Sequence, residues 1–299
     1  MRLFLKKILI FALIIIAFLA MGEVVVRHVA TPYSYKYGYI KERGGEITTL
    51  VLGSSHTYYG IIPSELGDSV FNLANISQTP EYDFQLLKEY EPYMPHLRKV
   101  IIPISYFTFR DPKLEELDRG LCVQYKVGME LNLHPDLSIY NLALTDFKSY
   151  TGRLRNMILP EESNRCDSLG FGLGFGLDHR DPAWREKAEA RVEELTFATP
   201  GRADEVYRIL QSMIEYCDRR GIECVFVTTP VSKEFRQYAD KAQYAEMADY
   251  ASVLKGMVDG RYFDFYSSAA FDDEDFHDVD HLSDVGARKF SRLLREYMR

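Results

Sequence analysis

The sequence predicts an α/β domain with a mainly parallel β-sheet covered by helices on both faces, preceded by an N-terminal transmembrane helix. Three observations lead to this prediction. Short apolar runs alternate with segments of helical periodicity, these runs are continuously apolar, and a longer apolar run directly follows a basic N-terminus. Continuous apolar strands that alternate with helices are typical of a parallel sheet buried on both faces.

The apolar run at the N-terminus covers residues 8–21 and follows three basic residues, Arg2, Lys6 and Lys7. It is short for a bilayer span of about 20 residues, but Gly22 and the valines at 24–26 extend it. Because basic flanks stay in the cytoplasm, we expect a single-pass anchor in the inner or cytoplasmic membrane, with the rest of the chain outside. A cleaved signal peptide, with a site near Ala20-Met21-Gly22, is the alternative, and it exports the domain too.

Three regions follow from this pattern. Residues 1–26 form the basic tip and anchor, residues 27–46 are expected to be a stalk, and residues 47–299 form the α/β domain. Within the domain, the regular alternation is lost from about 106 to 200, which we interpret as an insertion that could cover the site.

The regular elements of the domain are placed by hydrophobic pattern and by their end signals. Strands are expected at about 48–53, 70–74, 99–105, 222–228 and 262–266, and Pro103 predicts a strand end or a bulge. Helices are expected at 81–93, 203–219, 233–258 and 283–298. Gly221 ends the second of these helices, and Ser283 caps the last.

Charge and cysteine content narrow the function classes. The net charge is -8, and the chain without Arg2, Lys6 and Lys7 carries -8 - 3 = -11. This net negative charge argues against a nucleic-acid partner. An anionic substrate would need a local basic site. Four cysteines do not make a disulfide scaffold: Cys217 and Cys224 are expected to be buried separately, and whether Cys122 and Cys166 pair is left open.

Two short motifs at opposite ends of the domain carry the chemistry. Ser55 follows the first strand in Gly53-Ser54-Ser55-His56, and Asp278 stands three residues before His281, ahead of the final helix. Both positions follow strands, and ligands of parallel sheets bind beyond the carboxyl ends of the strands. The motifs therefore supply a nucleophile, a base and an orienting carboxylate at one edge.

Each motif also has other interpretations. Gly53-Ser54-Ser55 alone is a common polar turn, and the acidic run 272–281 is compatible with a solvated loop. That run also allows a metal site built from His277, Asp278, Asp280 and His281, which would need further ligands from elsewhere.

The order Ser55, Asp278, His281 resembles that of the SGNH (GDSL-type) hydrolase superfamily, which implies a flavodoxin-like three-layer fold. By that resemblance Ser55 is the nucleophile, His281 the base and Asp278 its orienting partner, while Ser54 replaces the usual aspartate. The second family block is similar to residues 72–78, and the asparagine of the third block is absent after the strand at 99–105. The resemblance then implies oxyanion or substrate contacts from the residues near those blocks, namely Ser77, Gln78, Ser105, His56 and Asn75. A surface histidine at the start of a helix is the other interpretation of His56.

The Gly-Ser-Ser variant is similar to exported SGNH proteins of cell-surface polysaccharide O-acetylation and teichoic-acid D-alanylation. The resemblance implies a serine esterase or O-acyltransferase that acts through an acyl-Ser55 intermediate and needs no cofactor or metal. Expected partners are an acylated surface polysaccharide or acyl donor, a membrane-bound O-acyltransferase and the membrane. Two other classes stay open: a catalytically degenerate module that binds a polysaccharide or an assembly partner, and a metal-dependent phosphoesterase.

Overall fold

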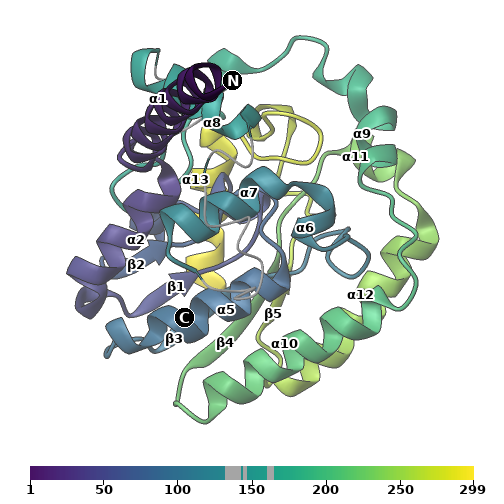
Figure 1. Ribbon diagram of the computed structural model, residues 1–299. Coiled ribbons are helices and arrows are strands. Elements are labelled where there is room, and N and C mark those ends of the chain that lie inside the picture. The colour runs from purple at the N-terminus through teal and green to yellow at the C-terminus, as the bar shows by residue number, and fades with distance from the viewer. Residues whose placement is uncertain (132–142, 144–146, 160–164) are drawn as a thin grey trace.

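The computed structural model describes residues 1–131, 143, 147–159 and 165–299. Its centre is a parallel five-stranded sheet with the order β2-β1-β3-β4-β5, which confirms the predicted fold class (Figure 1). The strands are β1 (Thr49–Val51), β2 (Val70–Asn72), β3 (Lys99–Pro103), β4 (Glu223–Thr228) and β5 (Tyr262–Asp264). Pro103 is the last residue of β3, as predicted, because proline cannot donate to a central ladder.

Successive side chains of the strands point into two separate cores, as a buried parallel sheet requires. Leu50 and Val100 belong to one core, which α5 (Pro80–Tyr90), α10 (Arg202–Asp218) and α12 (Lys241–Met257) cover. Val51 and Ile101 belong to the other, which α4 (Pro63–Leu66), α9 (Ala188–Glu194), α11 (Lys233–Tyr238) and α13 (Asp284–Tyr297) cover. The predicted helix 233–258 is two helices, since Asp240 caps the start of α12.

The N-terminal helix α1 (Arg2–Arg27) is long and apolar enough to cross a membrane, and nearly all of it is exposed. The stalk expected over residues 27–46 is instead largely α2 (Pro32–Arg43), which packs against the domain. Tyr33 and Ile40 share one face of α2 and are buried in the same core as Leu50. A capping box between Thr31 and Ser34 fixes the start of this helix.

The described part of the insertion is mainly helical. It contains α6 (Leu114–Leu117), α7 (Arg119–Val123), a π-helical turn over Gln124–Gly128, α8 (Phe147–Ile158) and α9. The other residues of the predicted insertion, 132–142, 144–146 and 160–164, lie outside the described residues. All four cysteines are free, so Cys122 and Cys166 do not form a disulfide.

Candidate active site

A tight turn between β1 and α3 (Ser55–Tyr58) presents the candidate nucleophile Ser55. The turn needs a glycine at position 53, where φ is +113° and a Cβ would come within 2.1 Å of the Pro103 side chain. The N–H of Gly53 donates to Asp83 Oδ1 at 2.8 Å, and its carbonyl accepts from the N–H of Asn75 at 3.1 Å. Helix α5 and the loop after β2 therefore hold this turn, and with it Ser55, at the carboxyl edge of the sheet.

The structure brings Ser55, His281 and Asp278 together in one hydrogen-bonded chain. His281 Nε2 lies 2.8 Å from Ser55 Oγ, and His281 Nδ1 lies 3.0 Å from both carboxylate oxygens of Asp278. Asp278 Oδ1 also accepts from the backbone N–H of His281 at 2.8 Å, which fixes the carboxylate. Because Nδ1 faces a carboxylate, it carries the ring proton and leaves Nε2 free to accept from the Ser55 hydroxyl.

Burial and the neighbouring carboxylates shift the pKa of His281 in opposite directions. Burial alone lowers the pKa of His281, but the nearby carboxylates of Asp278 and Asp280 outweigh it, and the net pKa is raised. A base with a raised pKa holds a proton from serine more firmly once it has accepted it.

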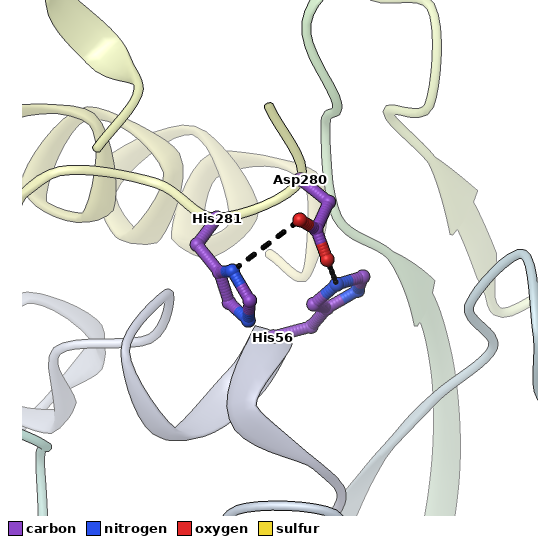
Figure 2. A group of neighbouring side chains, drawn as sticks. All are labelled: His56, Asp280 and His281. Carbon is purple, nitrogen blue, oxygen red and sulfur yellow. Dashed lines mark hydrogen bonds and ion pairs between the residues drawn. The ribbon is translucent and has the colours of Figure 1, made fainter. Parts of the chain in front are cut away.

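A second histidine–aspartate pair lies beside the first, and sequence reasoning did not recognise it. His56 Nε2 donates to Asp280 Oδ2 at 3.1 Å, and the rings of His56 and His281 meet edge to face at 5.0 Å (Figure 2). His56 is only 4% exposed, so it is not a surface histidine. Burial is the main cause that lowers the pKa of His56, so its neutral form is favoured.

The insertion supplies a cation to this second pair. Arg191 of α9 donates through Nε to Asp280 Oδ1 at 2.9 Å and through Nη2 to Oδ2 at 3.0 Å. Asp280 Oδ1 lies 3.6 Å from His281 Nδ1, so the carboxylate stands between the two imidazoles. Asp280 is completely buried, yet these partners hold its pKa well below the usual range despite the cost of burial. The buried pair of His56 and Asp280 and the partly exposed Arg191 thus form a hydrogen-bonded charge network behind His281.

The side chains of Ser105, Gln78 and Asn75, which were expected to stabilise an oxyanion, bond other groups of the protein. Ser105 Oγ lies 3.1 Å from His56 Nδ1, and because His56 Nε2 donates to Asp280, Ser105 is the donor to Nδ1. The Gln78 side chain bonds Asp83, Asn75 and the Tyr125 hydroxyl, and its backbone N–H donates to the Asn75 carbonyl at 3.3 Å. Asn75 is buried in the same loop network, and Ser77 has a left-handed backbone, with φ +53°.

These contacts correct the expectation that Gln78 or Ser105 offers a free donor. Their polar atoms hydrogen-bond other buried groups of the protein, since leaving such groups unpaired would cost stability. The N–H groups of Ser55 and His56, in the first turn of α3, have no carbonyl available within their own helix. They are better candidates for binding an oxyanion.

A cavity of about 390 Å³ adjoins Asp278 and His281. Its other wall comes from the insertion and includes Trp184, Lys187 and Arg191. The insertion therefore borders the candidate site, as its position in the sequence suggested.

Within the described ranges, one group of side chains has metal-ligand geometry, and it is His56, Asp280 and His281, with donor atoms within 4.8 Å of one another. It is not the set proposed from the sequence, since His277 Nδ1 lies 3.1 Å from the Gly176 carbonyl instead. The Arg191 fork already neutralises Asp280 and would repel a cation placed there. The donor set therefore fits an ion-paired network better than a metal site.

No protein-family model matches the sequence, and no curated protein matches it. Among solved structures, a candidate acylhydrolase from Bacteroides fragilis aligns over 87% of this chain and 93% of its own, with 12% identity and a TM-score of 0.42. A Streptococcus pneumonia protein described as a candidate platelet activating factor aligns over 97% and 99%, with 11% identity and a TM-score of 0.44. At this level of likeness, function has to be inferred from the side chains of this chain.

Proposed function

We propose that this protein is an SGNH-type serine esterase or O-acyltransferase, anchored by α1 with its domain outside the cytoplasm. The observation that carries the proposal is the chain Ser55–His281–Asp278, with distances of 2.8 and 3.0 Å and a tautomer that leaves Nε2 to accept the serine proton. Geometry of this kind activates a serine hydroxyl for attack on an acyl carbon.

The reaction proceeds in two acyl transfers. Ser55 Oγ attacks the carbonyl carbon of an ester while His281 Nε2 takes its proton, and the N–H groups at the start of α3 bind the oxyanion. His281 then gives that proton to the leaving alcohol as its C–O bond breaks, which leaves acyl-Ser55. A hydroxyl from water or a glycan next gives its proton to His281 and takes the acyl group, and His281 passes that proton to Ser55 Oγ as the acyl–serine bond breaks.

The class of substrate follows from the resemblance and the anchor. A domain tethered to a membrane works best on molecules held at the same surface, and an acylated cell-surface polysaccharide or its acyl donor fits this position. A membrane-bound O-acyltransferase is the proposed partner. Water as the acceptor makes the protein an esterase, and a glycan hydroxyl makes it a transferase.

A degenerate binding module is the second candidate, and one observation favours it. The third family block has no asparagine, and the hydroxyl of Ser105 in its place is turned to His56. Loss of one oxyanion donor typically costs about 10²–10³-fold in rate.

The test is hydrolysis of p-nitrophenyl acetate by the full chain in detergent, together with labelling by a fluorophosphonate. We expect Ser55→Ala and His281→Ala each to lower turnover by about 10³-fold or more, and Ser55→Ala to abolish labelling. Ser212→Ala, on the exposed face of α10, is the matched control and should keep both. Wild-type turnover no faster than that of the variants, without labelling, would favour the binding module.

A further inference from the structure

A cavity of about 690 Å³ at the membrane end of the molecule lies away from the candidate triad. It is lined by the end of α1, the turn into α2, the end of α8 and the segment 165–166. Most of its lining is apolar, including Val24, Val25, Ala30, Pro32 and Met157. Its volume is within the range of about 300–1,000 Å³ for small-molecule sites.

The end of α1 is held directly against the domain, so the cavity lies where the chain leaves the apolar helix. Val26 is fully buried in the main core, and the N–H of Ala143 donates to Glu23 Oε1 at 2.9 Å. A Cβ on Gly22 would come within 2.0 Å of the Tyr150 hydroxyl, which shows how closely α8 approaches. With α1 in a bilayer, this cavity therefore opens at the membrane surface.

Helix α8 adds a second apolar surface at the same level. It packs beside α1 (Figure 1). Large apolar side chains in and just after α8 are exposed: Phe147 by 69%, Met157 by 56%, Ile158 by 74% and Leu159 by 62%. An exposed apolar group next to a membrane-length helix is typical of an element that lies in the lipid interface.

A single cation marks the polar end of the cavity. Arg165 is exposed, and within the described part of the chain no carboxylate is paired with it. Its carbonyl accepts from the Tyr58 hydroxyl at 3.1 Å. Tyr58 is the last residue of α3, the helix that Ser55 begins. This hydrogen bond therefore connects one wall of the cavity to the helix that carries the candidate nucleophile.

We propose that this cavity binds an acyl chain of a membrane lipid, with the anionic phosphate of its headgroup beside Arg165. An apolar cavity at the membrane surface is suited to a lipid chain, and guanidinium groups bind phosphate well. The proposal rests on α1 as a retained anchor, and it does not depend on esterase activity. A lipid bound here lies against the wall that supports α3.

The test uses the full chain in phosphatidylcholine nanodiscs that contain phosphatidylglycerol with a diazirine near the ester end of one acyl chain. After irradiation, cross-linked residues are mapped by mass spectrometry. We expect adducts on Tyr35 and Cys166, which line the cavity, as well as on α1. Because cross-linking needs no turnover, this result and the esterase assay are independent of each other.

Cavity-filling variants separate a specific site from general contact with the bilayer. Ala30→Trp and Val25→Phe should abolish adducts on Cys166 and leave those on residues 8–21 unchanged. Ala269→Trp, at an exposed alanine after β5, is the matched control and should change neither. Arg165→Gln should remove the preference for the phosphatidylglycerol probe over a diacylglycerol probe with the same chain. Adducts confined to α1, or Cys166 adducts that persist in both cavity-filling variants, would overturn the proposal.

Discussion

Asp280, which is buried, and Arg191, which is partly exposed, form an ion pair whose two charges act on His281 in opposite directions. The Asp280 carboxylate lies 3.6 Å from His281 Nδ1, and Arg191 binds that carboxylate through two nitrogens. The other titratable groups facing His281 are Asp278 and His277 from its own loop, His56 from α3 and Tyr59, which follows α3. Across the adjoining cavity are His179 and the ion pair of Lys187 with Asp181.

The two charges predict opposite shifts in the acid limb of the pH–rate profile. Asp280→Asn removes a carboxylate that stabilises the imidazolium, so the acid limb of kcat/KM should move to lower pH by about one unit or more, with a lower plateau. Arg191→Gln leaves Asp280 without its cationic partner, which raises the pKa of His281 and moves the limb to higher pH. Esterase pH profiles of both variants, with Arg295→Gln as the exposed control, check this. Shifts in the same direction would mean that the pair acts only by supporting the fold.

Lys36 gives a second prediction for a single residue, this time for stability. Burial lowers the pKa of Lys36 from 10.5 to about 7, and its Nζ donates to the Ala74 carbonyl. Between these two values the unfolded chain binds a proton at Lys36 that the folded chain has released. The contribution of Lys36 to the free energy of unfolding therefore rises with pH, by up to about 1.4 kcal/mol per pH unit.

Lys36→Met removes this titration, because methionine carries no charge in either state. The stability advantage of the variant over wild type should accordingly be largest near pH 7 and shrink toward pH 9. Urea unfolding at pH 7, 8 and 9 measures the difference. A difference that stays constant across this range would show that Lys36 keeps its proton in the folded protein.

The β1–α3 turn shows how one element positions the candidate site. Gly53→Ala places a Cβ against Pro103 in addition to the cost of a positive φ, so it should shift Ser55 and abolish turnover. Gly201→Ala is a matched control, since Gly201 has φ +73° with nothing within 4 Å of the added Cβ. It should cost about 1–2 kcal/mol in stability and leave activity unchanged. Equal activity of the two variants would mean that the turn tolerates a side chain.

The sequence was sufficient to predict the elements whose signals are local. The five strands were placed to within a few residues, and Ser55, Asp278 and His281 were selected by their position after strands and by their spacing. Charge pairing across the fold was not predictable in this way. The sequence assigns Asp278 to the His281 imidazole, but only the structure shows that Asp280 bonds His56 and Arg191.

The α2 segment was missed for a different reason. Its tyrosines and glycines suggested a stalk, but Tyr33 and Ile40 are seven residues apart and share one helical face. Thr31, Pro32 and Ser34 form a helix start that the sequence did contain. The sequence thus contains the signals for a helix, but it does not show the core against which the face with Tyr33 and Ile40 packs.

For the whole molecule, the packing of α1 and α2 determines where the chain can be cut. Deletion of residues 1–21 removes most of the apolar helix and keeps Glu23 and Val26, which contact the domain. Deletion of residues 1–46 also removes Tyr33, Lys36 and Ile40, all of them buried. Burying a large apolar side chain contributes about 1.5–3 kcal/mol, so loss of Tyr33 and Ile40 alone consumes much of the 5–15 kcal/mol that stabilises a typical domain.

We therefore expect the chain that begins at residue 22 to fold and remain soluble without detergent, and the chain that begins at residue 47 to aggregate or melt at a much lower temperature. Circular dichroism melting curves of the two chains, beside the full chain in detergent, test this. The double substitution Tyr33→Ser and Ile40→Ser in the chain from residue 22 should reproduce the instability, since it removes the same contacts without a deletion. If the chain from residue 47 melts like the longer one, α2 is a peripheral addition, and the α/β domain is independent of the segment that joins it to the membrane.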